Sequence, residues 1–356
     1  SIPLSDVANK GVMTAVDDTS RRAVLAGLSA VAGGSVAGCL GGTRQRVTLG
    51  VGPVGSRSHR AGRGLAVAAD RHSETLAVST TTVEGHVERL YALDRGEIDA
   101  AAADNTTLYR ASEAVGAFAA DPVEGLPHQG FGYGWRDHYW VAAADLDSTA
   151  ALGETDLTTE AGSETGTDVD AEMGAVYPGQ PGRPGRLVTE QLLRAADRWE
   201  PATVDNRPRE AVAAAVDRGE IGAVAAVETD GGLAPWCRRL DATAGGRLGG
   251  LPVGEAFGEA IEAAPNATAA AVEPTGWAET SLPATVDGWR VPSQWLFDPA
   301  VEGRVVADLR ALAREHTGVL DGDDTPAGEA AAAAVAGAVM PSLPVHEGVA
   351  DAEEGA

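Results

Sequence analysis

The apolar and polar positions after residue 45 follow a repeating order of short strand, glycine-containing loop and amphipathic helix. Short apolar runs bounded by Gly, Pro or Asp indicate strands, whereas apolar residues three or four positions apart indicate helices. Gly96 is the natural end of one such helix. The pattern predicts strands at 46–51, 76–81 and 98–103 and helices at 58–71 and 83–95. This βαβαβ order predicts a parallel sheet with crossover helices.

A second round of the same pattern lies further along the chain. Residues 94–98 and 217–221 both read Asp-Arg-Gly-Glu-Ile, each time between a helix and an Ala- and Val-containing strand. This repetition indicates two similar α/β lobes. The expected elements are strands at 139–144, 173–177, 221–227 and 289–297 and helices at 187–197, 211–218, 299–316 and 326–339. The polar, acidic residues 153–172 are expected to form an exposed loop.

The first forty residues have the pattern of an export signal. Arg21 and Arg22 precede an apolar stretch rich in small residues, which ends at Val36-Ala37-Gly38-Cys39. Paired arginines before such a stretch are typical of the twin-arginine route. The final four residues resemble a lipobox, in which Cys39 carries the lipid. The alternative is an Ala/Gly-rich buried helix that happens to begin with two arginines.

Charge gives the first indication of the working medium. The chain has 52 Asp and Glu against 27 Lys and Arg, a net charge of -25, and Lys10 is its only lysine. Such an acidic surface repels phosphate backbones, which argues against general nucleic-acid binding. At molar salt the Debye length falls to about 3 Å and screens the self-repulsion. The composition therefore favours a salt-loaded environment over the alternative of an acidic protein from ordinary cytosol.

Motifs for catalysis or metal binding are absent from the sequence. Two cysteines, Cys39 and Cys237, are too few for a Cys-rich metal site, and the seven histidines include no pair four residues apart. The sequence also lacks Gly-x-Ser-x-Gly, a Walker loop and a Gly-x-Gly-x-x-Gly opening the first helix. We therefore expect a protein that is not an enzyme, with no metal and no cofactor.

Two glycine-containing loops at strand ends are the candidate ligand-binding segments. They cover residues 52–56 and 178–186, and arginines accompany both. Ligands of open α/β sheets bind at the carboxyl ends of strands, and a guanidinium can hold a carboxylate through two hydrogen bonds. Asp104 also follows a strand. The alternative is that these arginines are solvated charges beside turns and that Asp104 serves turn formation.

Four segments, in order, resemble the TAXI family of solute receptors of TRAP transporters. They are the strand and glycine loop at 49–56, the helix ending in Gly-Glu-Ile-Asp at 87–100, Pro181-Gly182 with the helix start at 186–193, and Leu-Pro-Val-His-Glu-Gly at 343–348. The sequence departs from the family at Arg57-Ser58-His59 and at His86 and Arg89. It also departs in the loop that begins at Pro181-Gly182, where Arg183 and Gly185 stand in place of hydroxyl-bearing residues of the family.

The resemblance implies a bilobed periplasmic-binding-protein-like fold of type II, with a ligand cleft between two α/β lobes. We expect a signal peptide, lipobox and tether at 1–45, lobe 1 at 46–143 plus 275–345, lobe 2 at 144–274 and a disordered tail at 346–356. The function implied is extracytoplasmic capture of a small, anionic organic solute, such as an amino acid or carboxylate. Its partners would be a TRAP-type membrane permease and, through Cys39, the cell membrane.

The candidate binding residues fall into three groups. Charge recognition is assigned to Arg57, Arg183 and Arg186, hydrogen bonding to Gly55, Ser56, His59 and Gly182, and lining of the same cleft to His86 and Asp104. Three alternatives stay open, which are an ABC-type solute-binding protein, a ligand-binding sensor on the same fold, and an anchored extracellular enzyme.

Overall fold

The structure is a computed structural model, and it describes residues 44–143, 148–149, 152, 174–229, 231–316, 318, 335–336 and 338–350. The export signal with Arg21, Arg22 and Cys39, the acidic loop at 153–172 and residues 351–356 lie outside the described residues. In the part of the chain that is described, no helix is both long and apolar enough to cross a membrane.

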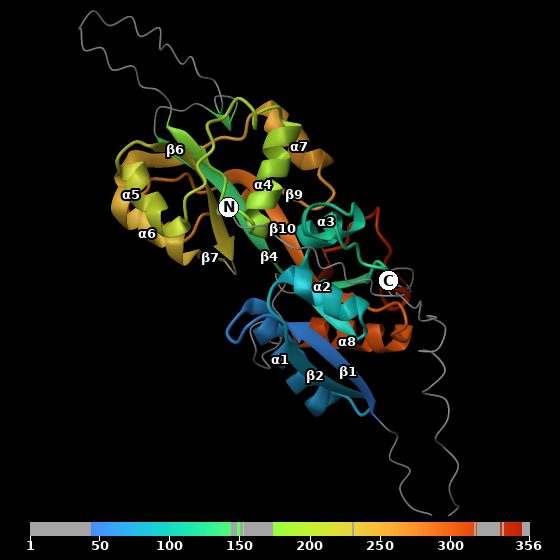
Figure 1. The fold of residues 1–356 in the computed structure, drawn as a ribbon. Helices are drawn as coiled ribbons and strands as arrows, with labels where there is room; N and C mark the ends of the chain where they lie inside the picture. Colours follow the sequence, from blue (N-terminus) through green and yellow to red (C-terminus); the bar gives the residue numbers. More distant parts are fainter. Residues whose placement is uncertain are drawn as a thin grey trace, which may run out of the picture. The chain divides into compact units, whose positions relative to one another are not determined.

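The first lobe is built on five strands of one ten-stranded sheet, with helices on both faces (Figure 1). Its strand order is β2-β1-β3-β10-β4. The strands β1 (Gln45–Val51), β2 (Leu76–Thr82) and β3 (Ala100–Asp104) are parallel, whereas β10 (Val286–Phe297) is antiparallel to β3. The predicted βαβαβ order is therefore confirmed, but the sheet is mixed rather than all parallel.

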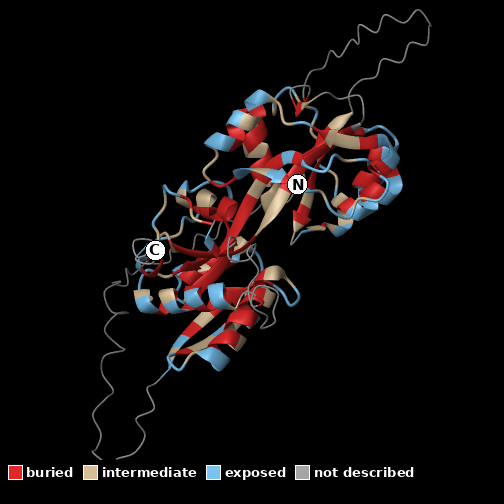
Figure 2. Cartoon of the chain, turned by 180° about the vertical axis from the view of Figure 1, so that it is seen from behind, coloured by how far each residue is buried: buried red, intermediate tan, exposed pale blue. Residues whose placement is uncertain are grey.

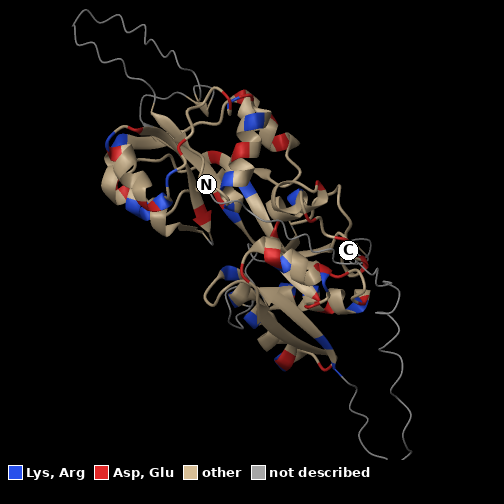
Figure 3. Cartoon of the chain, viewed as in Figure 1, with Lys and Arg blue, Asp and Glu red and all other residues tan. Residues whose placement is uncertain are grey.

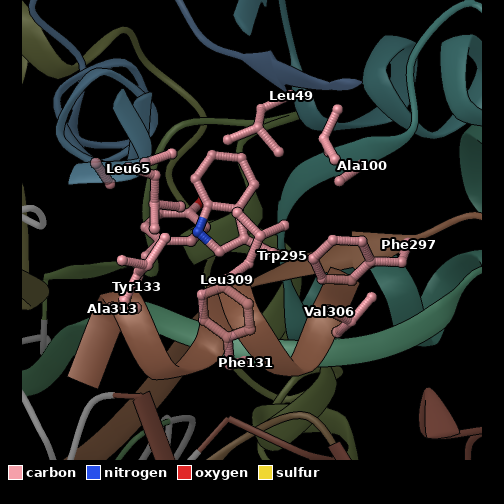
Figure 4. Packing of buried hydrophobic residues seen from close by; sticks show 14 of the residues in the cluster. Leu49, Leu65, Ala100, Phe131, Tyr133, Trp295, Phe297, Val306, Leu309 and Ala313 are labelled. Atoms are coloured by element: carbon pink, nitrogen blue, oxygen red, sulfur yellow. The ribbon is translucent and has the colours of Figure 1, made fainter. Parts of the chain in front are cut away.

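Alternating side chains along these strands create two separate apolar layers. Ala100 and Ala102 of β3 pack with α1 (Arg57–His72) and α8 (Gly303–Glu315), and Figure 4 shows this cluster around Trp295 and Leu309. Ala101 and Ala103 face the other way, toward α2 (His86–Asp94) and α3 (Asn105–Ser112). Because strand side chains point to opposite faces in turn, the four consecutive alanines of β3 serve both layers.

The second lobe repeats this arrangement around a second set of strands. It contains the C-terminal half of β4 (His128–Ala143), β5 (Ala175–Tyr177), β6 (Ile221–Thr229), β7 (Gly232–Leu233), β8 (Leu248–Leu251) and β9 (Thr268–Val272). The helices α5 (Val212–Asp217) and α6 (Pro235–Ala244) cover one face. The helices α4 (Pro184–Ala195) and α7 (Glu255–Ala263) cover the other. Figure 2 shows the buried strands and the exposed outer sides of the helices.

Two long strands, β4 and β10, belong to both lobes. The N-terminal part of β10 pairs with β9 and its C-terminal part with β3, while β4 pairs with it along much of its length (Figure 1). The register places Ser293 opposite Gly134 and Gln294 opposite Gly132, so Tyr133 is an extra residue on β4. Such a bulge bends a strand and increases its twist. Two crossover strands thus join two α/β lobes, and the predicted bilobed α/β architecture is confirmed.

The C-terminal segment is part of the first lobe. The backbone N–H of Gln129 donates to Pro344, and His346 donates back to Gln129 at 2.8 Å. The side chain of Gln129 also donates to the carbonyl groups of Met340 and Leu343. Residues 346–350, expected in a disordered tail, instead include α11 (Glu347–Ala350), whose Val349 lies in the core. The expectation of disorder was wrong there because Val349, an apolar residue within a mostly polar segment, packs into the core.

Two buried carboxylates fix the segment that returns to β10. Asp241 accepts backbone hydrogen bonds from Ala278, Glu279 and Thr280, and Glu228 accepts from the N–H and the hydroxyl of Thr275. Asn105 and Asn266, each of which stands in the Asn-x-Thr pattern of glycosylation acceptors, are likewise buried and use their amide groups in internal hydrogen bonds. These four polar residues therefore serve folding, and the folded chain does not present either asparagine to a glycosyl donor.

The bidentate pair between Arg290 and Asp137 joins the two crossover strands, and its loss should lower stability. Arg290 donates to both carboxylate oxygens at 2.7 and 3.1 Å and lies 4.2 Å from the centre of the Trp135 ring. We expect Arg290→Ala to reduce the free energy of unfolding by about 1–2 kcal/mol, because a charge-assisted hydrogen-bond pair and a cation–π contact are lost. Urea unfolding checks this, with Arg63→Ala on the exposed side of α1 as the control. An Arg290→Ala midpoint equal to that of wild type would contradict it.

Candidate functional site

Two adjoining cavities lie where loops of both lobes meet β4. The first, here the Ser56 cavity, has a volume of about 450 Å³ and lies beside the starts of α1 and α2. The second, here the Trp236 cavity, has a volume of about 400 Å³ and lies beside the 178–186 loop, β6 and the start of α6. His86, Arg136, Arg183 and Thr229 line both cavities. The two cavities therefore share part of their walls, and together they are here called the cleft.

The cleft concentrates positive charge in a strongly acidic protein. Its lining includes six guanidinium groups, from Arg57, Arg89, Arg136, Arg183, Arg186 and Arg209. Glu84 is the one acidic residue among the described residues that line either cavity. Over the outer helices, by contrast, acidic and basic residues are interspersed (Figure 3). The cleft is thus an environment that attracts an anion.

The start of α1 is organised by hydroxyl groups. Ser56 caps the helix by accepting from the backbone N–H of His59 at 3.3 Å, and Ser58 accepts from the N–H of Gly52 at 2.9 Å. Gly55 has a φ of 84°, in the left-handed region that glycine tolerates best. This turn brings Ser56 and Ser58 to the wall of the Ser56 cavity.

Arg57 bridges from α1 to the bulged part of β4. Its Nη1 donates to the carbonyl oxygen of Trp135 at 2.9 Å, and its guanidinium lies where a side chain on Gly134 would stand. Gly134 has a φ of 148°. Only a residue without a Cβ leaves room for this guanidinium, so the bulge and the glycine together position Arg57 in the cleft wall.

His86, Asp104 and Arg136 form a connected polar group. The backbone N–H of Asp104 donates to Nδ1 of His86 at 3.0 Å, and Nη2 of Arg136 donates to Oδ2 of Asp104 at 3.1 Å. Burial lowers the pKa of His86 to about 4, and the Asp104 carboxylate offsets this only in part. His86 is therefore neutral near pH 7. Since Nδ1 is an acceptor, the proton is assigned to Nε2, which can donate to a solute.

Asp104 lies behind the cleft wall. Its side chain is fully buried and accepts from both the N–H and the hydroxyl of Thr107 at 2.8 Å. Burial alone raises the pKa of its carboxyl, but His86, Arg136 and Thr107 outweigh burial and lower the pKa to about 2. Asp104 is thus ionised and orients Arg136, which does line the cleft.

The 178–186 loop holds two arginines in different environments. Arg186 is buried, donates to the carbonyl oxygen of Gly179 at 3.1 Å and to Asn206 at 2.9 Å, and lies over Trp199. Arg183 is exposed at the start of α4 and lines both cavities. Arg186 therefore fixes the loop, while Arg183 presents its charge where the cavities join.

Apolar and aromatic side chains form part of the wall of the Trp236 cavity, alongside Arg186 and Arg209. They come from Tyr177, Ala225, Val227, Pro235 and Trp236. His138 also lines it, fully buried, with its ring stacked on Trp289 at a centroid distance of 5.5 Å. Burial, with the nearby Arg136, lowers the pKa of His138 to about 3, so its ring is neutral.

The structure brings together part of the set predicted from sequence. Ser56, Arg57, His86, Arg183 and Arg186 line the cleft. Gly55, His59, Gly182 and Asp104 are not among the lining residues. Gly55 and Gly182, the latter with a φ of 76°, shape the two turns. His59 contributes its backbone N–H to the Ser56 cap.

Several lining residues were not found from the sequence, among them Arg136, His138, Tyr177, Arg209 and Trp236. One signal was present, because Trp135-Arg136-Asp137-His138 places charges inside an otherwise apolar and aromatic strand. The shorter strand predicted at 139–144 left these residues out. No group of three or more His, Cys, Asp or Glu able to hold a metal ion occurs within the described residues.

Comparison with known proteins gives structural likeness only. No protein-family model matches the chain. No curated protein matches it in sequence. Among solved structures it is similar to the aliphatic sulphonate binding protein SsuA of Escherichia coli, at 15% identity and a TM-score of 0.39 over 78% of each chain. A TctC solute binding protein from Polaromonas gives 13% identity and a TM-score of 0.43 over 81% of this chain and 86% of its own.

The likeness extends to a protein of another class. The regulatory domain of OxyR2 from Vibrio vulnificus gives 14% identity and a TM-score of 0.33 over 82% of this chain and 100% of its own. At these scores we draw nothing about function from any of the three.

Replacement of His138 should change how stability depends on pH. The pKa of His138 is about 3 when folded, against an ordinary value of 6.5, so the unfolded chain binds more protons between these values. Stability is therefore lost as the pH falls below 6.5. In His138→Phe, which keeps a ring against Trp289, we expect the free energy of unfolding to fall less steeply between pH 5.5 and 4.5, by about 1.4 kcal/mol per pH unit. Urea titrations across that range measure it, and identical slopes would contradict the assignment of a neutral, buried ring.

Proposed function

We propose that the chain is an extracytoplasmic solute-binding protein that captures a small anionic organic solute in the cleft at β4. This proposal rests on the contrast between the positive charge of the cleft lining and the negative net charge of the chain. Among the described residues, six arginines and one glutamate line the cleft of a protein whose net charge is -25. Guanidinium groups hold carboxylates through charge-assisted hydrogen bonds, and Arg183 presents an exposed guanidinium here, which makes a carboxylate-bearing solute the natural occupant.

Within this proposal, the residues of the cleft have different roles in binding the solute. Arg183 and Arg136 contact the anionic group where the two cavities join, with Arg57 and Arg89 on the Ser56 side. His86 donates from Nε2, and Ser56 and Ser58 offer hydroxyl groups at the start of α1. Asp104 and Arg186 are positioning residues, because each holds a neighbour through short hydrogen bonds.

Closure would occur about β4 and β10. These strands connect the lobes, and the bulge at Tyr133 is the local irregularity beside the cleft. A solute that contacts Arg57 on one side and Arg183 on the other stabilises the closed arrangement through its differential contacts with the two lobes. The closed surface would then be recognised by a membrane permease.

The permease and the anchoring follow from sequence features. The four segments that resemble the TAXI family favour a TRAP-type permease over an ABC-type one. Arg21, Arg22 and Cys39 support twin-arginine export and a lipid anchor on the outer face of the cell membrane. The near absence of lysine and the net charge support a salt-loaded medium.

Loss of Arg183 should weaken binding of carboxylates. We expect Arg183→Ala to raise the dissociation constant roughly 10–100-fold, because a charge-assisted hydrogen bond contributes about 1.5–3 kcal/mol. Calorimetric titration of the lipid-free protein with a panel of carboxylates in molar salt measures the effect.

The matched control is Arg239→Ala, which removes an exposed arginine of α6 that lines neither cavity. It should leave the dissociation constant unchanged. Absence of binding by every carboxylate, or equal affinities in wild type and Arg183→Ala, would refute recognition of the anion by this arginine.

Anchoring is tested through the cysteine of the lipobox. Cys39→Ser removes the thiol that accepts the lipid, so the protein should move from the membrane fraction to the soluble extracytoplasmic fraction. Cell fractionation with detection of the protein measures this, and Cys237→Ser, at a buried position, is the control. A Cys39→Ser protein that stays with the membrane would contradict lipid anchoring at this residue.

A further inference from the structure

The two cavities differ in the chemistry of their walls. Four arginines line each cavity, but serines and Glu84 accompany them in the Ser56 cavity, whereas aromatic, aliphatic and proline side chains accompany them in the Trp236 cavity. All four residues shared by the cavities are polar, and two of them are Arg136 and Arg183. An anionic group held by these two arginines therefore lies beside a cavity whose wall includes aromatic, aliphatic and proline side chains as well as Arg186 and Arg209.

That space is larger than a small carboxylate needs. At about 400 Å³ the Trp236 cavity would hold roughly a dozen waters at about 30 Å³ each. Water against apolar walls is readily displaced by an apolar group, with a gain in free energy that grows with the area buried. The cavity also lies within the range of about 300–1,000 Å³ typical of sites for organic ligands.

Trp236 is held in place as a partly exposed wall. It follows Pro235 at the start of α6, and the residue before them, Ala234, donates its N–H to Val227 at 3.0 Å. Its ring packs edge to face on Tyr177, with centroids 5.9 Å apart and planes at 70°. A rigid, partly exposed indole is a stacking surface for a flat group.

Two buried polar groups in the same wall point to a ligand. The Tyr177 hydroxyl and both ring nitrogens of His138 have no hydrogen-bond partner among the described residues, and both side chains are at least 99% buried. Leaving such groups unpaired costs free energy, which a polar substituent of a bound molecule can recover after a small adjustment of the wall.

We propose that the solute carries a planar ring as well as its anionic group, with the ring in the Trp236 cavity and the anion between Arg136 and Arg183. The ligand class is thus the ring-bearing carboxylic acids, with a hydroxyl on the ring tolerated near Tyr177. This inference rests on the proposed function, since it uses the same arginines for the anion.

The test is calorimetric titration of the lipid-free full-length mature protein with matched compounds in molar salt. The probes are acetate, phenylacetate, 4-hydroxyphenylacetate and the uncharged 2-phenylethanol. Phenylacetate should bind at least about tenfold more tightly than acetate, because ring burial and stacking add to the ionic contact. The uncharged alcohol should bind much more weakly than phenylacetate.

Variants separate the ring from the anion. Trp236→Ala should abolish the advantage of phenylacetate over acetate, and Trp236→Phe should keep much of it. Arg183→Ala should weaken both acids by a similar factor. Trp277→Ala, at a partly exposed tryptophan that lines neither cavity, is the matched control and should retain the advantage. Unfolding midpoints establish that each variant is folded, and Trp236→Phe is the test should Trp236→Ala fail to fold.

The possible outcomes are distinct. Equal affinities for acetate and phenylacetate, both weakened by Arg183→Ala, would overturn the ring proposal and leave anion capture standing. Tight binding of 2-phenylethanol, which has the ring but no charge, would overturn the proposal that the solute needs both a ring and an anionic group. An unchanged phenylacetate advantage in Trp236→Ala would place the ring elsewhere and overturn the assignment of this cavity. No binding of either acid would overturn anion capture and the ring proposal together.

Discussion

The antiparallel pairing of β4 with β10 is the constraint on which the rest of the structure depends. Backbone hydrogen bonds join Gly288–Ser293 to Gly134–Tyr139, and the cross-strand pair of Arg290 and Asp137 reinforces them. Because side chains alternate along a strand, Tyr139 enters one core of the second lobe and Trp140 the other. The same pairing therefore organises both layers of that lobe while connecting it to the first.

This arrangement also explains why the cleft is basic. Arg136 stands on the crossover strand, between the start of α2 and the 178–186 loop, so its charge reaches both cavities. Its position is fixed by Asp104, whose own charge is held by Thr107 inside the first lobe. A buried carboxylate thus orients an arginine rather than meeting a solute. In the second lobe Arg186 has a comparable structural task beside the more exposed Arg183.

Sequence patterns predicted much of the fold and part of the candidate site. The strands β1, β2 and β6 and the helices α1, α5 and α8 were expected within a few residues of where they lie, because their apolar positions follow one clear period. Two short helices were missed from the sequence. Helix α3 begins directly at the end of β3, and helix α7 contains a glycine. Of the predicted site, Ser56, Arg57, His86, Arg183 and Arg186 line the cleft because they lie at the starts of helices that follow strand ends. Arg136 was overlooked because β4 starts at His128, well before its apolar part.

By itself, the sequence determined the alternation of strands and helices, the repetition of that alternation in two lobes, the acidic character of the chain and the loops at which arginines gather. These properties depend on residues near one another along the chain, where period and composition are sufficient. Only the tertiary structure decided which arginines share a cleft and which serve the scaffold. His86, Arg136 and Arg183 are separated by about fifty residues each along the chain, and β4 brings them to one place. The division between Arg183, exposed at the cleft, and Arg186, held by Gly179 and Asn206, arises from contacts that no local pattern encodes.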